Sequence, residues 1–528
     1  MRKRNIYTLA IGALAVACNT EKAPDAVQNP NIVIILADDL GYGDVQHYNT
    51  ERGKIPTPNL DRLAAQGMSF TDAHSSSAVC SPSRYSLLTG RYHWRSRLQK
   101  GIVGLFDDPL ITPDRLTVAG LVKQQGYQTA CIGKWHLGWD WPIDEAMRPL
   151  WKVNKTVEGE DDESFVATDE QKEAWQSVYA NPIDGGPTTV GFDHYFGTDV
   201  PNWPPYCFIE DDRTIGIPSE FLPKKLLGNN MASMAGPAVS DWKLENILPE
   251  LCSRAAKYIT ESAQKDEPFL LYLPLTSPHT PLAVNEAWDG KSKLNRYADF
   301  VMETDAHIGR VLDAIEKSGE SNNTLIIFTS DNGCAHYIGA NELETKGHFP
   351  SGPWRGYKSD VWEGGHRVPF IVKWPGVVEA GSTSDQLVQQ VDIMATLADV
   401  IGVKLPDNAG EDSFSLVSLL KGNDRPVRDN AVNSSIRGVP SVRQGEWKLI
   451  LDSGSGGWTK GESDQEIQLY NLTTDPGETT NLVLEYPEKA EEMKALLEEL
   501  IVRGRSTPGK VQDNDVEVVR FNTVSKAK

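Results

Sequence analysis

The sequence has 528 residues, of which 39% are hydrophobic and 24% are charged. This composition is typical of a globular protein with a large core, and the length favours two domains. The formal net charge of −21 argues against a nucleic-acid surface, so an anion would have to be bound by a local cluster of cationic side chains or by a metal ion.

The first 18 residues predict an export signal. Basic residues at positions 2–4 precede an apolar run over residues 6–17, which is too short to cross a bilayer comfortably. Because small residues lead to Cys18, as in a bacterial lipobox, we expect Cys18 to be lipidated. The protein would then be a periplasmic or outer-membrane, cell-surface lipoprotein, whereas cleavage just before Cys18 would leave a soluble periplasmic protein. Residues 19–30 are polar and contain prolines, and they predict a tether.

Apolar runs rich in β-branched residues predict the strands of an α/β domain over residues 31–430. In chain order they read NIVIILA, TACIGK, FLLYLPLTSPH, TLIIFTSDN and RVPFIVKWPG, and their continuous hydrophobicity is typical of buried, parallel strands. Helical spacing of apolar residues predicts helices over 117–125 and 297–317, and this alternation indicates a doubly wound sheet. Residues 139–190 are rich in tryptophan and acidic residues with little periodicity, and they predict an insertion or a lid near the site.

The sequence pattern changes near residue 430, and this change predicts a smaller α+β domain over residues 431–528. The stretches GEWKLILDSGSGG and EIQLYNL predict antiparallel strands joined by Gly-rich turns. Residues 487–503 predict an amphipathic helix.

Charged and polar residues stand where several of the predicted strands end. In open α/β sheets, ligands bind beyond the carboxyl ends of the strands, so segments that are distant in sequence would meet at one edge of the sheet. Their shared position is a stronger indication of a site than any one of them alone. The residues in these places are Asp38, Asp39, Lys134, His136, His279, Asp331 and Asn332.

Two of these pairs, Asp38-Asp39 and Asp331-Asn332, offer only oxygen atoms as ligands. Such donors favour Ca²⁺ or Mg²⁺ over Zn²⁺. One pair alone would be explained more simply as turn-forming residues, but two pairs after two hydrophobic strands predict a metal site. A group of cationic side chains beside the metal would form a cationic wall of the site. Together with the metal ion, it would suit a tetrahedral anionic group such as sulfate or phosphate. The residues that would form this wall are Arg84, Lys134, His136, His279 and Lys358.

The motifs along the chain resemble those of the type I sulfatases, the formylglycine-dependent sulfatases of the alkaline phosphatase superfamily. The resemblance runs from about Pro30 to at least Leu482. It is carried by NIVIILADDLGYGD, CSPSRYSLLTGR, GKWHLG, GFDHYFG, SPHTPL, FTSDNG, KSDVWEGGHRVPF and LYNLTTDPGETTNL. It implies an alkaline phosphatase-like α/β fold, with a mixed, mostly parallel sheet between helices and a smaller C-terminal α+β domain that carries an antiparallel sheet.

The resemblance also implies a catalytic role for Cys80, which is not spaced from the other cysteines as in a zinc site. In the family the cysteine of C-x-P-S-R is oxidised to formylglycine, which makes Cys80 the source of the nucleophile. One hydroxyl of the formylglycine hydrate would attack sulfur and displace the alcohol, leaving a covalent sulfate ester. Deprotonation of the second hydroxyl would then expel sulfate and restore the aldehyde. A serine at this position could attack but could not carry out this elimination.

The other site residues are matched to the family one by one. Arg84 matches the residue that steadies the hydrate, and Lys134 matches the one that binds the nucleophile and sulfate oxygens. His136 matches the group that assists proton loss from the hydrate. His279 and Lys358 match the residues that bind sulfate and protonate the leaving alcohol. The residues that match the Ca²⁺ ligands are Asp38, Asp39, Cys80, Asp331 and Asn332.

The substrate is predicted as a sulfated glycan. The export signal and the aromatic segments suit a carbohydrate sulfatase, and the motifs are similar to those of N-acetylgalactosamine-6-sulfatases and galactose-6-sulfatases. This similarity implies a 6-O-sulfated galactose or N-acetylgalactosamine, and a formylglycine-generating enzyme as the partner that matures the chain. The residues predicted to contact the sugar are His194, Asp199, Trp203, Trp354 and Arg355.

Two other functions remain open from the sequence. The first is a phosphate or phosphonate monoester hydrolase of the same superfamily, which in its two-metal form needs a second set of ligands. The second is an exported lipoprotein that binds glycans on an inactive sulfatase scaffold, which the loss of a catalytic residue would favour. The residues that could be recruited to a second metal are Asp305, His307, His336, His348 and His366.

Overall fold

The computed structural model describes residues 29–151, 167–227 and 233–519. The predicted export signal, with Cys18, and nearly all of the predicted tether lie outside the described residues, as do residues 152–166 of the predicted insertion. Within the described part of the chain, no helix has the length and hydrophobicity that a membrane span requires.

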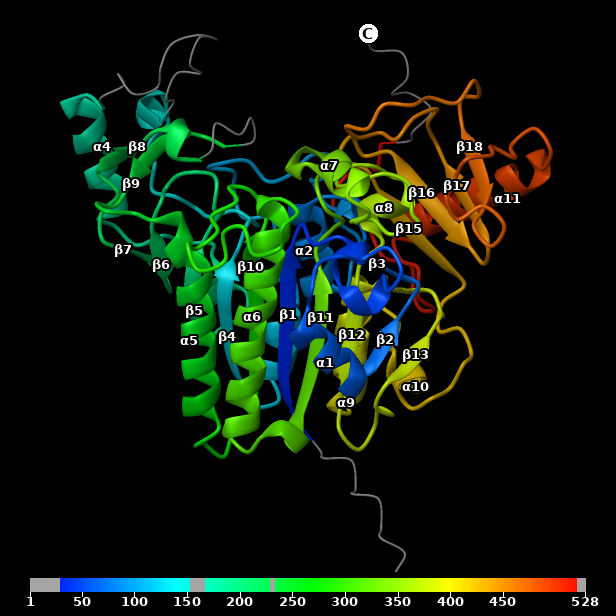
Figure 1. The fold of residues 1–528 in the computed structure, drawn as a ribbon, viewed down its shortest axis with the longest axis horizontal. Helices are drawn as coiled ribbons and strands as arrows, with labels where there is room; N and C mark the ends of the chain where they lie inside the picture. Colours follow the sequence, from blue (N-terminus) through cyan, green and yellow to red (C-terminus); the bar gives the residue numbers. More distant parts are fainter. Residues whose placement is uncertain (1–28, 152–166, 228–232, 520–528) are drawn as a thin grey trace, which may run out of the picture.

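A ten-stranded mixed sheet forms the centre of the protein (Figure 1). Pairing is parallel through the five strands in its middle, which confirms the predicted mostly parallel sheet between helices. Across the sheet the strands are β13 (Ser382–Ser384), β2 (Met68–Phe70), β12 (Phe370–Lys373), β11 (Thr324–Ser330), β1 (Asn31–Asp38), β10 (Phe269–Pro278), β4 (Gln128–Lys134), β5 (His194–Thr198), β6 (Phe208–Glu210) and β7 (Arg213–Ile215).

The stretch RVPFIVKWPG forms β12, which runs antiparallel to both β11 and β2. The predicted parallel pairing is therefore wrong for this strand. A parallel neighbour needs a crossover connection over a face of the sheet, whereas residues 331–369 stay at the carboxyl edge of β11 and return the chain from there. This long connection carries α7 (Ala340–Thr345) and α8 (Glu363–His366), which lie in the upper part of Figure 1, and it also carries Lys358.

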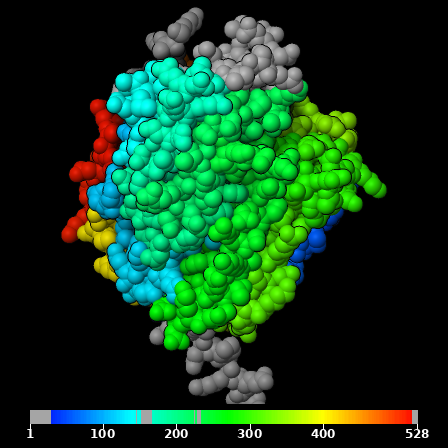
Figure 2. Space-filling model, turned by 90° about the vertical axis from the view of Figure 1, so that its left-hand side faces the viewer, coloured from blue at the N-terminus to red at the C-terminus, as the bar shows by residue number. Residues whose placement is uncertain are grey.

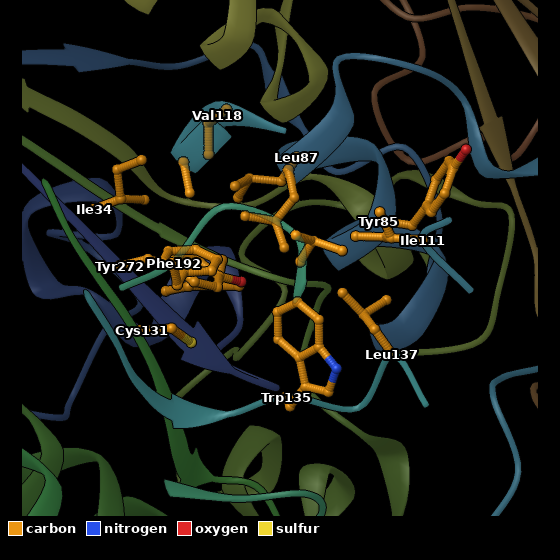
Figure 3. Close-up of a cluster of buried hydrophobic side chains, with 14 of the residues drawn as sticks. Ile34, Tyr85, Leu87, Ile111, Val118, Cys131, Trp135, Leu137, Phe192 and Tyr272 are labelled. Carbon is orange, nitrogen blue, oxygen red and sulfur yellow. The ribbon is translucent and has the colours of Figure 1, made fainter. Parts of the chain in front are cut away.

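The central strand β1 is buried on both faces, which explains its continuous apolar sequence. Ile32, Ile34 and Leu36 pack on one face, and their neighbours in the strand pack on the other. The core on the Ile34 face is shown in Figure 3. The helices of that face are α2 (Cys80–Thr89), α3 (Val118–Lys123) and α9 (Ile393–Val400), and those of the opposite face are α1 (Pro58–Gln66), α5 (Ile247–Ser262) and α6 (Arg296–Lys317).

The helices predicted over 117–125 and 297–317 are confirmed as α3 and α6. The described parts of residues 139–190 are packed into the core, so they do not form the predicted lid. They contain α4 (Asp169–Tyr179), and Trp139, Trp151 and Trp175 are buried in the same core as Ile34. These parts therefore form a fixed part of the domain at the end of the sheet near β7, which faces the viewer in Figure 2.

The C-terminal part of the chain carries its own four-stranded antiparallel sheet, as predicted. Its strands are β15 (Asn430–Ser434), β16 (Pro440–Gln444), β17 (Trp447–Ile450) and β18 (Gln468–Asn471), and α11 (Pro487–Val502) packs against it. The division of the chain at residue 430 stays a prediction. The remaining strands and α-helix of the described residues are β3 (Ala73–His74) with β14 (Val388–Gln389), β8 (Glu220–Leu222) with β9 (Gly236–Ala238), and α10 (Val417–Leu420).

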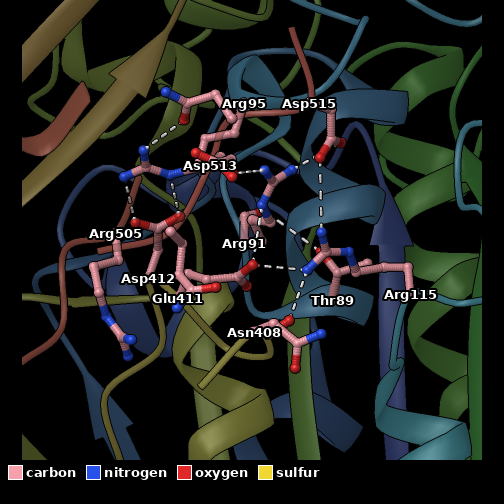
Figure 4. A network of polar contacts seen from close by, with 12 residues as sticks. Thr89, Arg91, Arg95, Arg115, Asn408, Glu411, Asp412, Arg505, Asp513 and Asp515 are labelled. Atoms are coloured by element: carbon pink, nitrogen blue, oxygen red, sulfur yellow. Dashed lines mark hydrogen bonds and ion pairs between the residues drawn. The ribbon is translucent and has the colours of Figure 1, made fainter. Parts of the chain in front are cut away.

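Two buried arginines tie the chain just after α2 to later segments (Figure 4). Arg95 donates to both carboxylate oxygens of Asp412 at 2.8 and 2.9 Å, and to the carbonyl of Leu500 in α11 at 3.0 Å. Arg91 pairs with Asp515 at 3.0 Å. Because α2 begins at Cys80, these contacts help to fix the helix that carries the predicted nucleophile.

We expect Asp412→Ala to lower the free energy of unfolding by about 3–5 kcal/mol, because Arg95 would stay buried without its carboxylate partner. Denaturation in urea, followed by circular dichroism, measures the change. A matched control is Glu261→Ala, which removes an exposed partner of Lys257 and should cost less than about 0.5 kcal/mol. An Asp412 variant as stable as this control would contradict the expectation.

Candidate active site

Four neighbouring strands bring the predicted site residues to one edge of the sheet. In the order β11, β1, β10 and β4, the strands end at Asp331, Asp38, His279 and Lys134 or directly before them. Each of these side chains is at most 6% exposed. The structure therefore assembles residues that lie up to about three hundred positions apart in the chain. This is the expected arrangement, because ligands bind beyond the carboxyl ends of the strands in such sheets.

The oxygen-bearing residues lie against one another. Asn332 Nδ2 donates to Asp39 Oδ1 at 2.8 Å, and the Asp39 backbone N–H donates to Asp331 Oδ1 at 3.1 Å. Possible ligand atoms of Asp38, Asp39 and His279 all lie within 4.8 Å of one another. The Asn332 Oδ1 atom is buried, and it has no hydrogen-bond partner among the described residues.

Each of the three carboxylates faces a buried cation. Lys134 Nζ lies 2.8 Å from Asp38 Oδ2, and Lys358 Nζ lies 2.6 Å from Asp39 Oδ1. Arg84 donates from Nη2 and Nε to Asp331 Oδ2 at 2.7 and 3.1 Å, and from Nη1 to the carbonyl of Lys134 at 3.0 Å. Positive and negative side chains are thus balanced inside the site.

The pKa values of the Asp38 and Asp331 carboxyl groups are shifted in opposite directions. Burial alone would raise the pKa of Asp38, but Lys134, His279 and Arg84 together hold it well below its ordinary value. Burial and repulsion by Asp38 raise the pKa of Asp331 to about 7. Such separation is typical of functional sites, where a group must gain or lose a proton near neutral pH.

Cys80 is the first residue of α2 and is only 3% exposed. Burial raises the pKa of its thiol, and Lys134 and Lys358 offset this only in part. The thiol is therefore protonated at neutral pH, whereas a cysteine nucleophile needs a lowered pKa. The surroundings do not suit an unmodified cysteine as a nucleophile.

His136 stands directly after β4 in a left-handed backbone conformation, with φ of 55°. Its backbone N–H donates to Asp199 Oδ1 at 3.1 Å, and its Nε2 lies 3.2 Å from the carbonyl of Val103. Its Nδ1 is buried without a partner among the described residues. Burial, with Lys134 and Arg84, lowers the pKa of His136 well below its ordinary value, so this ring is neutral and can accept a proton.

The five predicted sugar contacts divide into two groups. Asp199 holds the His136 backbone, and the Trp203 ring centroid lies 5.6 Å from that of His136, so both belong to the surroundings of the site. His194 begins β5 at the opposite edge of the sheet and pairs with Asp211 at 2.9 Å.

The other two predicted sugar contacts have partners elsewhere. Trp354 lies beneath the guanidinium of Arg367, 3.8 Å from its Cζ. Arg355 stacks on Trp362 and donates to the carbonyl of Glu478 in the C-terminal part of the chain. Their predicted contact with a sugar stays a prediction.

Two aromatic residues that the sequence did not single out lie beside the site. Tyr337 follows β11, and Trp458 belongs to the loop between β17 and β18, and their ring centroids are 5.9 Å apart. Tyr337 follows FTSDNG within a few residues, which is a weak signal. Trp458 gave none, because its Gly-rich surroundings predict only a turn.

The residues considered for a second metal are dispersed. Asp305 caps the start of α1 by accepting from the backbone N–H of Leu60 at 2.8 Å. His348 binds Asp44 at 2.8 Å, and His366 faces His74, with 3.1 Å between their Nδ1 atoms. His348 and His366 are fully buried.

Two protein-family models together match most of the chain. The family model described as Sulfatase matches residues 30–403. A second model, described as the C-terminal part of N-sulphoglucosamine sulphohydrolase, matches residues 355–505. The matched ranges include both the large mixed sheet and the C-terminal antiparallel sheet.

Individual relatives cover most of the chain as well. The N-acetylgalactosamine-6-O-sulfatase of Bacteroides thetaiotaomicron is 33% identical over 511 residues, which cover 93% of this chain and 97% of that protein. The steryl-sulfatase of Homo sapiens is 31% identical over 466 residues, covering 82% and 77%. A solved structure is described under the metabolism of multiple glycosaminoglycans by B. thetaiotaomicron. It is 29% identical with a TM-score of 0.75, and the match covers 90% of this chain and 99% of that one.

Proposed function

The chain belongs to the sulfatase family, and we propose that it hydrolyses sulfate esters of carbohydrates, with a 6-O-sulfated galactose or N-acetylgalactosamine as the substrate. The observation that supports sulfate-ester chemistry is the meeting of three carboxylates, three cations and Cys80 at the carboxyl ends of four strands. The full-length similarity to an N-acetylgalactosamine-6-O-sulfatase supports the choice of sugar.

We propose Ca²⁺ as the metal, held by Asp38, Asp39, Asp331 and Asn332 together with modified Cys80. These residues fit the ion, because the protein side chains offer hard oxygen donors and Asn332 Oδ1 is buried without a hydrogen-bond partner in the described part of the chain. When bound, Ca²⁺ would polarise the nucleophile and a sulfate oxygen. Lys134 and Lys358 lie on Asp38 and Asp39, and they would turn toward the oxygens of the substrate.

We further propose that Cys80 is oxidised to formylglycine by a maturation enzyme. The raised pKa of the thiol supports this, since the unmodified side chain is a poor nucleophile in its place. Arg84 is fixed by Asp331 and would hold the hydrate of the aldehyde in one orientation. The free Nδ1 of His136 would accept the proton that the hydrate loses.

His279 would donate a proton to the leaving alcohol. Its Nε2 lies 3.6 Å from Asp39 Oδ2, and its Nδ1 contacts the carbonyl of Thr280, which fixes the ring. Burial and Lys358 lower the pKa of His279 to about 4. A bound sulfate ester adds negative charge beside the ring and raises its pKa, so the proton would be taken up together with substrate.

We expect His279→Ala to slow hydrolysis of sulfated sugars about 10²-fold, because a sugar alcohol is a poor leaving group without a proton donor. The loss on an activated aryl sulfate should be less than about tenfold, since its phenolate leaves unaided. Initial rates on both substrates measure the contrast. The control is His307→Ala, which removes a histidine of α6 that lies beside Arg310. Equal losses on both substrates would count against the role of His279.

The proposal is tested first by the mass of the tryptic peptide 63–84, taken from protein made in its own cells. An aldehyde at Cys80, followed by sulfate release from a panel of sulfated sugars, would support it. An unmodified thiol would overturn it and favour the glycan-binding lipoprotein. Release of phosphate in preference to sulfate would favour the phosphate or phosphonate monoester hydrolase.

Export and lipid attachment at Cys18 complete the proposal. They rest on the N-terminal sequence and would place the enzyme in the periplasm or on the cell surface, where it would meet glycans. Labelling of cells with a radioactive fatty acid, compared between the natural chain and Cys18→Ala, tests the attachment.

A further inference from the structure

Two aromatic side chains stand together at the surface beside the site. Tyr337 is 41% exposed and Trp458 is 47% exposed. Their ring planes are inclined by 43°, with centroids 5.9 Å apart. Single exposed aromatic residues are common, but aromatic surface that gathers next to a site marks ligand binding.

The loop that carries Trp458 is fixed to the segment that carries Lys358. The Trp458 backbone N–H donates to Ser359 Oγ at 2.9 Å and to Asp360 Oδ1 at 3.1 Å. At Gly457, a Cβ atom would fall 2.4 Å from Asp360 Oδ1, so glycine permits this close approach. The position of Trp458 beside Lys358 is therefore built into the loop.

The segment that carries Tyr337 is also fixed to the segment that carries Lys358: the Lys358 backbone N–H donates to the carbonyl of Cys334 at 2.8 Å, and the ring centroids of His336 and Tyr357 lie 5.2 Å apart. Burial raises the pKa of the Tyr337 hydroxyl, and Lys358 lowers it. The same hydroxyl lies beside Thr280, the neighbour of His279. The pair thus stands on the side of Lys358 and His279, where the proposed leaving alcohol departs.

We infer that Tyr337 and Trp458 form a sugar-binding platform, on which the ring that carries the sulfate ester lies while its sulfate reaches Cys80. This inference deepens the proposed function and rests on it. The C–H face of a pyranose would cover aromatic surface that is now open to water. Tyr337 comes from the large domain and Trp458 from the C-terminal part of the chain, so the platform needs both.

The test is the steady-state kinetics of Trp458→Ala on N-acetylgalactosamine 6-sulfate, with both proteins matured to the same extent. We expect KM to rise at least about tenfold while kcat stays within about twofold, because stacking binds substrate and transition state alike. Trp458→Phe should recover most of the loss, since it keeps an aromatic face. The backbone contacts of Trp458 do not depend on its side chain, so the loop should keep its place.

Tyr486→Ala is the matched control. Tyr486 is 45% exposed, belongs to the same part of the chain and packs on another aromatic ring, Trp447, with 5.0 Å between centroids. It should leave KM unchanged. Turnover by the natural chain with an unchanged KM in Trp458→Ala would overturn the platform alone, as would an equal effect of Tyr486→Ala. No sulfate release from any sulfated sugar by the natural chain would overturn the proposed function, and the platform with it.

Discussion

Cys80→Ala is expected to lower the turnover of sulfate esters by at least about 10³-fold, because it removes the side chain from which the nucleophile is made. The fold should survive. Position 80 is the start of α2, and the helix is held in the core by residues further along it, among them Tyr85 and Leu87 (Figure 3). Sulfate release and the thermal unfolding midpoint, measured on the same preparation, separate loss of chemistry from loss of structure.

Cys252→Ala is the matched control for this variant. Cys252 is another buried cysteine, and it forms no disulfide with any cysteine that the structure describes; it lies in α5, on the opposite face of the sheet from α2. It should keep full activity at a small cost in stability. Cys80→Ser adds a sharper comparison, since a serine could attack sulfur but could not eliminate the sulfate. It should stop after about one turnover per chain. Sustained activity in Cys80→Ala would refute the assignment.

Asp331→Asn is expected to lower turnover by about 10²–10³-fold, the scale of losing one electrostatic contact to the transition state. It would also weaken Ca²⁺ binding, because a charged ligand becomes neutral while the shape is kept. In the natural chain, Ca²⁺ at about 100 times its Kd should stabilise the fold by about 2.7 kcal/mol. Thermal unfolding with and without Ca²⁺ measures this gain independently of activity, and the variant should show little of it.

The pH dependence gives a second readout for Asp331. Its pKa of about 7 in the fold lies above the ordinary value of 3.8, so between these values the folded chain holds a proton that the unfolded chain has lost. Without metal, the stability contributed by this group is therefore present at low pH and is lost as the pH rises toward 7. Asp331→Asn should lack this slope.

Asp305→Asn serves as the control for the Ca²⁺ readout. Its carboxylate is buried and caps α1, away from the strand ends that carry the site. Its Ca²⁺-dependent stabilisation should equal that of the natural chain. An Asp331 variant that behaves like the Asp305 variant would show that the metal lies elsewhere.

Local patterns in the sequence were sufficient for the elements that are buried on both faces. β1 and α6 follow directly from their apolar runs, since a strand or helix in this setting must be apolar along its buried surface. The direction of β12 did not follow. Its composition is that of any buried strand, and its antiparallel pairing depends on the long connection that precedes it.

The sugar contacts show the same limit. Aromatic composition pointed to Trp354, but this ring is covered by Arg367, whereas the exposed Trp458 lies in a stretch that predicts a turn. Exposure depends on what packs above a side chain, and the neighbours come from other parts of the chain. No local pattern contains that information.

The sequence by itself determined the α/β class, the antiparallel C-terminal sheet, and the residue types that a metal-assisted sulfate site requires, because these depend on local periodicity and on the chemistry of short motifs. The tertiary structure alone decided which carboxylate faces which cation, why the pKa values of Asp38 and Asp331 separate, and that Tyr337 meets Trp458. Each of these depends on distances between segments that are far apart in the chain, and such distances are set only when the sheet and its loops are packed together.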